Sequence, residues 1–485
     1  MSDFNLKQDD IIELSAEKLV NSGSAIARYE GKAVFIEGAV PGDTVKVRIT
    51  RINKNFMRAK IIEIIKPSPH RIKPFCPLFN ACGGCSLQNI ECNFLIEQKQ
   101  KILEEIFSPD NLYAFSGIYF KPFIRAEKLQ NYRCKVQNAV SETKVSKRLL
   151  IGYYKENTHD TVNIKYCPIQ PKIIDEIVNY IRENWKFGAY VEKKDKGLLK
   201  HLVIRYSSTS EKLILTFVIN KDFEFFNKIK PELERFSDAL IAKFPVISGV
   251  LVNFNPKKTN KITGDKTELL FGEPFIHQKL YSNNGIEYTY KVSAESFFQI
   301  NPHVAQKVFD SVKSLIEPNS TILDAYGGVA AIGIFLSDKA KSLTLVEESE
   351  SSVNDAKENF KLNNCKNYEV FLGDAKEIFK SFLKSSVASD AKKDRAAQKN
   401  KGKNQSKTFD YTILDPPRKG SDKEALEIIS KLTKKAVIYV SCNPSTLARD
   451  AKILHENGFK LKSLQGADMF PFTHHIESIA YFEKE

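Results

Sequence analysis

This 485-residue chain lacks any apolar run that approaches the length needed to cross a membrane, which is about 20 residues. Its first residues also lack the basic segment and the apolar segment of a secretory signal peptide. These two absences predict a cytoplasmic protein with no membrane partner. In a reducing cytosol the eight cysteines are expected to be free thiols, metal ligands or nucleophiles rather than disulfides.

Acidic residues are too few to balance the basic ones, since 59 Asp and Glu stand against 73 Lys and Arg, a formal charge of +14. This excess predicts a polyanionic partner, with nucleic acid favoured over an anionic membrane surface. Part of the positive charge lies in residues 384–407, a stretch rich in lysine, alanine and serine. Such a stretch cannot bury a hydrophobic core, and we predict a disordered basic insertion there.

The N-terminal region, residues 1–66, contains short strand-like runs separated by turn residues. Strands of this length and spacing predict a small β-barrel. Lysines and arginines are interleaved with its apolar positions, as in OB-like barrels that follow a phosphate backbone. We interpret this region as an RNA-binding barrel, the alternative being a barrel whose charges serve solubility alone.

A cluster of cysteines follows the barrel, with Cys76, Cys82 and Cys85 spaced C-x5-C-x2-C around a Gly-Gly pair. In a reducing compartment these three thiols can converge on one inorganic centre. The spacing leaves the fourth ligand open between Cys92, which is close, and Cys167, which is far along the chain. Four thiolates also suit zinc, but the spacing does not reproduce the C-x2-C pairs that zinc prefers, which favours an iron–sulfur cluster.

The middle of the chain, residues 67–290, mixes strand-like and helix-like runs and predicts an α+β domain. Within it, Tyr132-Arg133-Cys134-Lys135 puts an aromatic ring beside two cations. Such a group can stack on and clamp a nucleic-acid strand. A surface strand explains the same four residues equally well.

From about residue 291 onwards, strand-like and helix-like runs alternate, which predicts an α/β domain with a Rossmann-like parallel sheet. One strand runs into the glycine-rich turn at Gly327, and the next strand ends on Glu347. An acid about 20 residues after such a turn binds the ribose hydroxyls of a nucleoside cofactor. The turn lacks a full G-x-G-x-x-G, which favours a nucleoside without a pyrophosphate, such as S-adenosylmethionine.

Two more strand-like runs end on chemically reactive residues, an Asp-Pro-Pro-Arg run that begins at Asp415 and a Ser-Cys-Asn-Pro run around Cys442. Methylation of pyrimidine C5 requires a thiolate to add to C6 first, because the addition makes C5 nucleophilic. Cys442 is the cysteine placed for this attack. A base must then remove the C5 proton, and Glu477 is the first candidate, with His474 and His475 as alternatives.

Taken together, these motifs resemble the S-adenosylmethionine-dependent RNA 5-methyluridine methyltransferase family, in particular its branch that acts on 23S ribosomal RNA. The resemblance covers nearly the whole chain. The shared pieces are the barrel at 1–66, C-x5-C-G-G-C at 76–85, Tyr132-Arg133-x-Lys135, Phe297-Phe298-Gln299-x-Asn301, Asp324-x-Tyr326-x-Gly328, Asp415-Pro416-Pro417-Arg418-x-Gly420, Ser441-Cys442-Asn443-Pro444 and Thr473-x-His475-x-Glu477.

The resemblance implies a TRAM-like barrel at 1–66, a central α+β domain at 67–290 and a Rossmann-like class I methyltransferase domain at 291–485. RNA is the implied partner, and no obligate protein partner is implied. The implied site residues are Cys442 as nucleophile and Glu477 as base, Gln299, Tyr326, Glu347 and Asp415 around S-adenosylmethionine, and Cys76, Cys82, Cys85 and Cys167 as ligands of a [4Fe-4S] cluster.

Two departures from the family pattern bear on these expectations. Ala330 and Ala331 stand where the family usually has glycine and threonine, which bears on cofactor affinity, and Cys134 replaces a usual asparagine. Two alternatives also remain open. One is the transfer-RNA branch, whose members typically lack both the barrel and the cluster cysteines. The other is a non-catalytic iron–sulfur protein that binds RNA, against which the retained catalytic motifs argue.

Overall fold

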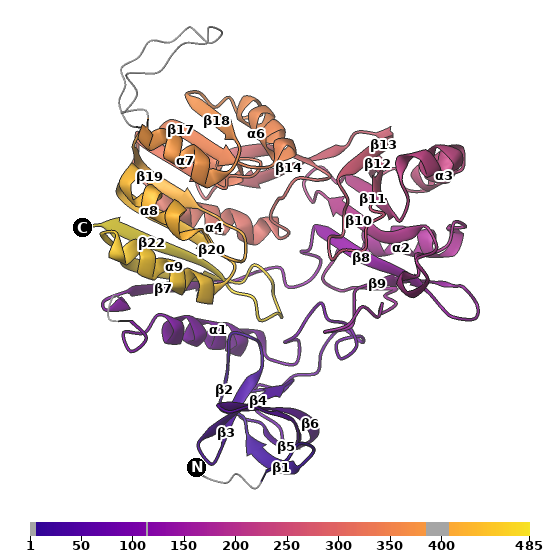
Figure 1. Cartoon of the computed structure of the whole chain (residues 1–485), viewed down its shortest axis with the longest axis horizontal. Coiled ribbons are helices and arrows are strands. Elements are labelled where there is room, and N and C mark those ends of the chain that lie inside the picture. The colour runs from indigo at the N-terminus through magenta and orange to yellow at the C-terminus, as the bar shows by residue number, and fades with distance from the viewer. Residues whose placement is uncertain (1–5, 113–114, 385–406) are drawn as a thin grey trace.

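The computed structural model describes residues 6–112, 115–384 and 407–485. The strands of these residues form four sheets, and Figure 1 shows an N-terminal barrel, a central domain and a large C-terminal sheet flanked by helices. The basic insertion expected at 384–407 lies, apart from its two end residues, outside the described residues. No described helix is long and apolar enough to cross a membrane.

The barrel is a six-stranded sheet in the order β1-β5-β6-β4-β3-β2. Its strands are β1 (Ile11–Ser15), β2 (Lys18–Leu19), β3 (Ala25–Tyr29), β4 (Lys32–Glu37), β5 (Thr44–Ile52) and β6 (Phe56–Lys66). Along β5, Val45, Val47 and Ile49 are buried, whereas Lys46 and Arg48 between them are exposed. This alternation follows from the two-residue period of a strand. The predicted N-terminal barrel is therefore confirmed, with these two cations on its outer side.

The central domain contains a second six-stranded sheet, in the order β13-β12-β11-β10-β8-β9. Its strands are β8 (Lys135–Glu142), β9 (Leu149–Gly152), β10 (Leu199–Tyr206), β11 (Leu213–Ile219), β12 (Ile247–Phe254) and β13 (Lys266–Gly272). The accompanying helices are α2 (Lys172–Asn184), the short 3-10 helix η2 (Glu192–Lys194) and α3 (Phe223–Lys243). Buried residues of α2 and α3 share one hydrophobic core with the strands.

The C-terminal sheet has eight strands, in the order β18-β17-β16-β19-β20-β22-β21-β7. They are β16 (Ser320–Ala325), β17 (Ala340–Glu347), β18 (Tyr368–Leu372), β19 (Phe409–Leu414), β20 (Thr433–Ser441), β21 (Phe459–Ala467), β22 (Glu477–Lys484) and β7 (Tyr119–Ile124). The run from β18 to β20 is parallel, whereas β22 is antiparallel to both of its neighbours.

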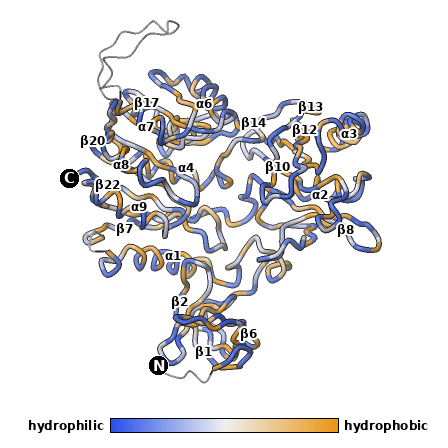
Figure 2. Tube along the Cα trace, viewed as in Figure 1, coloured by the Kyte–Doolittle hydropathy of each residue, from blue (hydrophilic) through white to orange (hydrophobic). Residues whose placement is uncertain are grey.

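Helices cover both faces of this sheet. They are α4 (Pro302–Ser314), α5 (Ala331–Phe335), α6 (Glu350–Leu362), α7 (Ala375–Lys384), α8 (Lys423–Leu432) and α9 (Pro444–Glu456). The last three share one hydrophobic core and the first three another, which also includes the hairpin of β14 (Phe275–Tyr281) and β15 (Glu287–Ser293). Figure 2 shows hydrophobic and hydrophilic residues alternating along α8 and α9, as expected of helices with one buried side. The predicted α/β class is confirmed.

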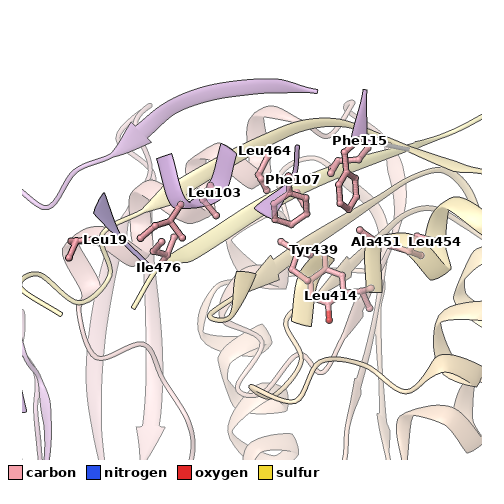
Figure 3. Packing of buried hydrophobic residues seen from close by; sticks show 14 of the residues in the cluster. Leu19, Leu103, Phe107, Phe115, Leu414, Tyr439, Ala451, Leu454, Leu464 and Ile476 are labelled. Atoms are coloured by element: carbon pink, nitrogen blue, oxygen red, sulfur yellow. The ribbon is translucent and has the colours of Figure 1, made fainter. Parts of the chain in front are cut away.

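Helix α1 (Cys92–Ile106) joins the barrel to the C-terminal sheet. Figure 3 shows Leu103 of α1 near Leu464 and Ile476, with Leu19 of the barrel close by, and all four belong to one continuous core. Strand β7, which follows α1, pairs in parallel with β21. Part of the region that the sequence assigns to the central domain, 67–290, thus belongs structurally to the C-terminal sheet.

Candidate active site

Three of the expected cofactor residues stand at the carboxyl edge of the parallel strands. The end of β16 is level with the ends of β17 and β19 in the sheet register. Tyr326, Glu347 and Asp415, which end or follow these strands, therefore lie at one edge. From β16 the next strands, β17 and β18, are added on one side, and from β19 the next strand, β20, is added on the other side. Such a reversal of strand order leaves a crevice between the two central strands, where ligands of α/β sheets bind.

The glycine turn after β16 is backbone-strained and is held by polar contacts. Tyr326 and Ala330 have φ angles of 62° and 65°, a region that costs a residue with a Cβ about 1–2 kcal/mol. The Gly328 N–H donates to the Glu347 carboxylate at 3.0 Å, and the Tyr326 hydroxyl lies 2.9 Å from the Ser421 hydroxyl. Strain of this kind persists where the surroundings over-determine it, often at ligand sites. A glycine at 330, as in the related family, would remove part of it.

Two carboxyl groups with raised pKa values line the same edge, Asp324 fully buried and Asp415 partly so. Burial raises the pKa of Asp415 to about 7, and burial together with Asp415 and Glu347 raises the pKa of Asp324 to about 7. Asp324 is a site residue that the sequence reasoning did not assign, and its carboxylate accepts the Gly333 N–H at 3.0 Å. The available signal was an acid inside an otherwise apolar strand. A cationic ligand at this edge would favour the ionised form of both groups.

The expected nucleophile and base lie at the ends of two neighbouring strands. Strand β20 pairs antiparallel with β22, and Ser441 lies opposite Ser478. The next position outward therefore sets Cys442 opposite Glu477. Residues so opposed have Cβ atoms about 4.5–5.5 Å apart on the same face of the sheet. Two residues distant in sequence are thus brought together by the antiparallel insertion of β22 beside β20.

Burial favours the neutral forms of both members of this pair, and two local features act against it at the thiol. Burial, and then the Glu477 carboxylate, raise the pKa of Cys442 to about 11, while Arg418 acts in the opposite direction. Burial and then Asp415 raise the pKa of Glu477 well above its ordinary value, and its side chain is 4% exposed. Cys442 also directly precedes the N-cap of α9, and a helix N-terminus stabilises a thiolate.

The alternative bases are poorer proton acceptors than Glu477. Burial lowers the pKa of His475 to about 3, and burial followed by Lys99 lowers the pKa of His474. A group with so low a pKa binds a proton weakly near neutral pH. The two imidazole rings pack against each other with centroids 4.3 Å apart, which fits a structural role.

Gln299 lies half-buried in the segment between β15 and α4. This segment is held to the rest of the molecule on both sides, because the Cys134 N–H donates to Ile300 O at 2.8 Å and the Asn301 amide donates to Met469 O at 3.2 Å. No hydrogen bond joins the Gln299 side chain to another residue in the described part of the chain, so its amide is free to meet a ligand.

Comparison with known proteins adds to this geometry. The sequence model of tRNA (uracil-5-)-methyltransferases matches residues 95–485, and that of the TRAM domain matches residues 10–62. The chain belongs to this family of RNA methyltransferases. Two bacterial relatives described as uncharacterized RNA methyltransferases, from Bacillus cereus and Halalkalibacterium halodurans, are each 31% identical over 99% of this chain and 98% of their own length.

A solved structure shares the fold of this methyltransferase. It is the Pyrococcus abyssi tRNA (uracil-54, C5)-methyltransferase in complex with S-adenosyl-L-homocysteine, with a TM-score of 0.70 at 23% identity, over 97% of this chain and 100% of that one. This structure confirms the fold, and the family match confirms the expected RNA methyltransferase.

The expected cluster ligands of the methyltransferase meet at one place. Cys76, Cys82, Cys85 and Cys167 line a single pocket, whereas Cys92 is not among its lining residues and instead begins α1. Burial raises the pKa of Cys85 to about 11 and that of Cys167 to about 12. Across 6–112, 115–384 and 407–485, however, no group of three or more His, Cys, Asp or Glu side chains is arranged to hold a metal ion.

The aromatic residue of the expected nucleic-acid clamp is not available to RNA. Tyr132 is 1% exposed and packs in a small hydrophobic cluster with Cys167, Ile164 and Ile169. Both interpretations of its tetrapeptide, a stacking clamp and a surface strand, are therefore wrong for this ring. The methyltransferase uses Tyr132 as a core residue beside the thiol pocket.

Proposed function

We propose that this methyltransferase methylates C5 of a uridine in RNA, most readily 23S ribosomal RNA, by covalent attack of Cys442 on C6 and removal of the C5 proton by Glu477. The observation that carries the proposal is the register of β20 against β22, which ends with Ser441 opposite Ser478 and leaves Cys442 and Glu477 at the adjoining positions, where the Glu477 charge acts on the Cys442 thiol. The target uridine must leave its stack to reach them, since C5 and C6 are covered in a helix.

The residues divide the chemistry between them. The Cys442 thiol loses its proton to solvent, helped by Arg418 and the N-terminus of α9, and its sulfur forms a bond to C6. The electron pair displaced from the C5–C6 bond makes C5 nucleophilic. S-adenosylmethionine, held by Tyr326, Glu347 and Asp415 at the strand edge and by Gln299, would supply the electrophilic methyl group to C5 and leave as S-adenosylhomocysteine. Glu477 then takes the C5 proton, the C5–C6 double bond re-forms, and the thiolate leaves.

Two features bear on the class of RNA. The four converging cysteines support ribosomal RNA, because members of the transfer-RNA branch typically lack them, whereas the barrel does not separate the two classes, since the matched tRNA methyltransferase extends over 97% of this chain. The Pyrococcus abyssi structure supports transfer RNA as the second candidate, since that protein's printed name gives a tRNA substrate and its fold covers 97% of this chain. The outward-facing cations of the barrel suit the phosphate backbone of either RNA.

The substrate is tested with transcripts that contain C5-tritiated uridine. The protein and S-adenosylmethionine are incubated with 23S ribosomal RNA or with unmodified transfer RNA, and tritium release to water is measured. Release from 23S RNA at a rate well above that from transfer RNA is expected. The reverse order would assign the transfer-RNA activity, and no release from either RNA by folded protein would refute uridine C5 methylation.

We further propose that Cys76, Cys82, Cys85 and Cys167 hold a [4Fe-4S] cluster. Their convergence on one pocket supports this set over one that contains Cys92. A four-iron cluster binds each thiolate through a different iron, so its ligands need not stand as close together as those of a single ion. Arg133, whose positive charge acts on Cys82 and Cys85, would offset the negative charge of four thiolates.

Replacement of one ligand should remove this metal centre. Cys82→Ser is expected to lose the iron, the acid-labile sulfide and the brown absorbance of anaerobically purified protein, because three thiolates hold a cubane weakly. Cys92→Ser is the matched control and should keep all three. Zinc in place of iron in the wild-type protein, or loss of iron in the control alone, would overturn the assignment.

A further inference from the structure

The loop that leads to Glu477 is unusually well buried for a connection between strands. We call residues 468–476, between β21 and β22, the base loop. Most of its residues are buried, although its backbone makes no sheet pairing. Its position therefore depends on side chains and backbone groups supplied by other segments. Those segments fix the position of Glu477, the first residue of β22.

At the centre of the base loop, Phe472 has a left-handed backbone with φ of 60°. Its side chain is 5% exposed. A bulky residue in this conformation is a genuine outlier, because its Cβ crowds the backbone. Such a conformation persists only where the surrounding structure over-determines it. The contacts of Phe472 therefore show what holds the loop.

Those contacts come from both ends of the thiol-bearing segment, residues 75–87. The Leu87 N–H donates to Phe472 O at 2.9 Å, and Leu87 follows Cys85 by two positions. The Phe472 ring packs edge-on against Phe75, with centroids 5.1 Å apart, and Phe75 directly precedes Cys76. Phe472 is thus held by residues next to Cys76 and close to Cys85, the first and last pocket cysteines of this segment.

Neighbouring positions of the base loop touch the same region. Ser86 Oγ lies 3.3 Å from His474 Nδ1, and the Tyr132 hydroxyl donates to Pro471 O at 3.4 Å. Tyr132 shares its small hydrophobic cluster with Cys167, the fourth cysteine of the pocket. On the other side, Gly23 of the barrel leaves no room for a side chain, since a Cβ there would come within 2.8 Å of the His474 Cβ.

We propose that the thiol-bearing segment is a positioning element for the catalytic base. Phe75 and Leu87 hold Phe472 in its left-handed conformation, and the base loop then delivers Glu477 opposite Cys442. A metal centre on the pocket cysteines would rigidify this clamp from within. Disturbing the clamp should impair proton removal from C5 while leaving thiol addition intact. The inference rests on the proposed role of Glu477.

Two reactions separate these steps. With RNA that contains 5-fluorouridine, C5 carries no removable proton, so the covalent complex of Cys442 and methylated base forms without any need for Glu477. Tritium release from C5-tritiated RNA requires both residues. A variant that misplaces the base alone should therefore form the 5-fluorouridine complex at the wild-type rate and release tritium slowly.

Phe75→Leu and Phe472→Leu are the test variants. Tritium release is expected to fall about 10- to 100-fold, as for a small misplacement of a catalytic group, while 5-fluorouridine complex formation stays unchanged. Phe75→Tyr keeps the ring and should restore release. Phe226→Leu is the matched control, since Phe226 forms a similar edge-on pair with Phe254 at 5.3 Å in the central core. It should change neither reaction.

A structural measurement complements the kinetics. Amide hydrogen exchange of Leu87 and of residues 470–477 is compared between wild-type protein and Cys82→Ser, and faster exchange is expected in the variant. Equal losses of complex formation and release, or unchanged release in Phe75→Leu, would overturn the positioning role. If Glu477→Gln releases tritium normally, the proposed base is wrong. If it does not but Phe75→Leu does, only the positioning inference fails.

Discussion

Replacing Cys442 by alanine is expected to lower tritium release by about 10³-fold or more, equivalent to about 4 kcal/mol of barrier. Uridine C5 is not nucleophilic enough to accept a methyl group unless a thiolate has added to C6. The same variant should form no covalent complex with 5-fluorouridine RNA, measured by denaturing gel electrophoresis. Cys442 is half-buried and lies outside the buried core, so the fold should survive the change.

Cys365→Ala provides the matched control for this prediction. Its thiol is also half-buried, and it lies in the connection from α6 to the start of β18, at the opposite end of that strand from the crevice, packed against the core. The control should release tritium at the wild-type rate and form the 5-fluorouridine complex. A Cys442→Ala protein that retains more than about a tenth of the activity would point to methylation without covalent attack.

The residues that end the parallel strands could be recognised from the sequence because they break a pattern. Asp415 and Cys442 interrupt apolar runs at positions where a hydrophobic residue would continue a buried strand, and Glu347 does the same at the end of β17. Carboxyl ends of parallel strands share one edge of a sheet. Their proximity thus follows from the fold class alone.

Features that depend on contacts between distant segments leave no such local pattern. Lys99 and Asp468 form an ion pair at 2.6 Å with side chains 1% and 2% exposed, yet a lysine in an amphipathic helix reads as a surface residue. Tyr132 reads as a stacking residue and is buried. The left-handed backbone of Phe472 is imposed by tertiary contacts, and nothing in its neighbouring residues indicates it.

Glu477 could be proposed from the sequence, but the reason for preferring it could not. Its placement opposite Cys442 depends on β22 entering the sheet between β20 and β21, and a strand order is not written in any one segment. The choice against His474 and His475 rests on burial, which raises the pKa of the carboxyl group and lowers the pKa of both imidazoles.

The pH dependence of turnover follows from these shifts. Cys442 must lose its proton to attack, and Glu477 must be ionised to accept one. Because both pKa values are raised, that of Cys442 to about 11, the fraction of each active form grows as the pH rises through the neutral range. Tritium release by the wild-type protein is therefore expected to increase from pH 6 to pH 9.

Replacing Glu477 by glutamine should trap the reaction after methyl transfer. Tritium release is expected to fall about 10²- to 10⁴-fold, the usual contribution of a general base, while the covalent complex accumulates on ordinary uridine RNA. Addition of the thiol should proceed as in the wild type, since Glu477 acts only after methyl transfer.

The trapped complex distinguishes a missing base from a damaged fold. Glu483→Gln, on the exposed end of the same strand, removes only a surface ion pair with Lys462 at 3.2 Å and should change neither reaction. A Glu477→Gln protein that loses complex formation and release together would indicate that Glu477 supports the site as a whole. Only a missing proton acceptor at this position explains a covalent complex that accumulates while tritium release stays low at every pH.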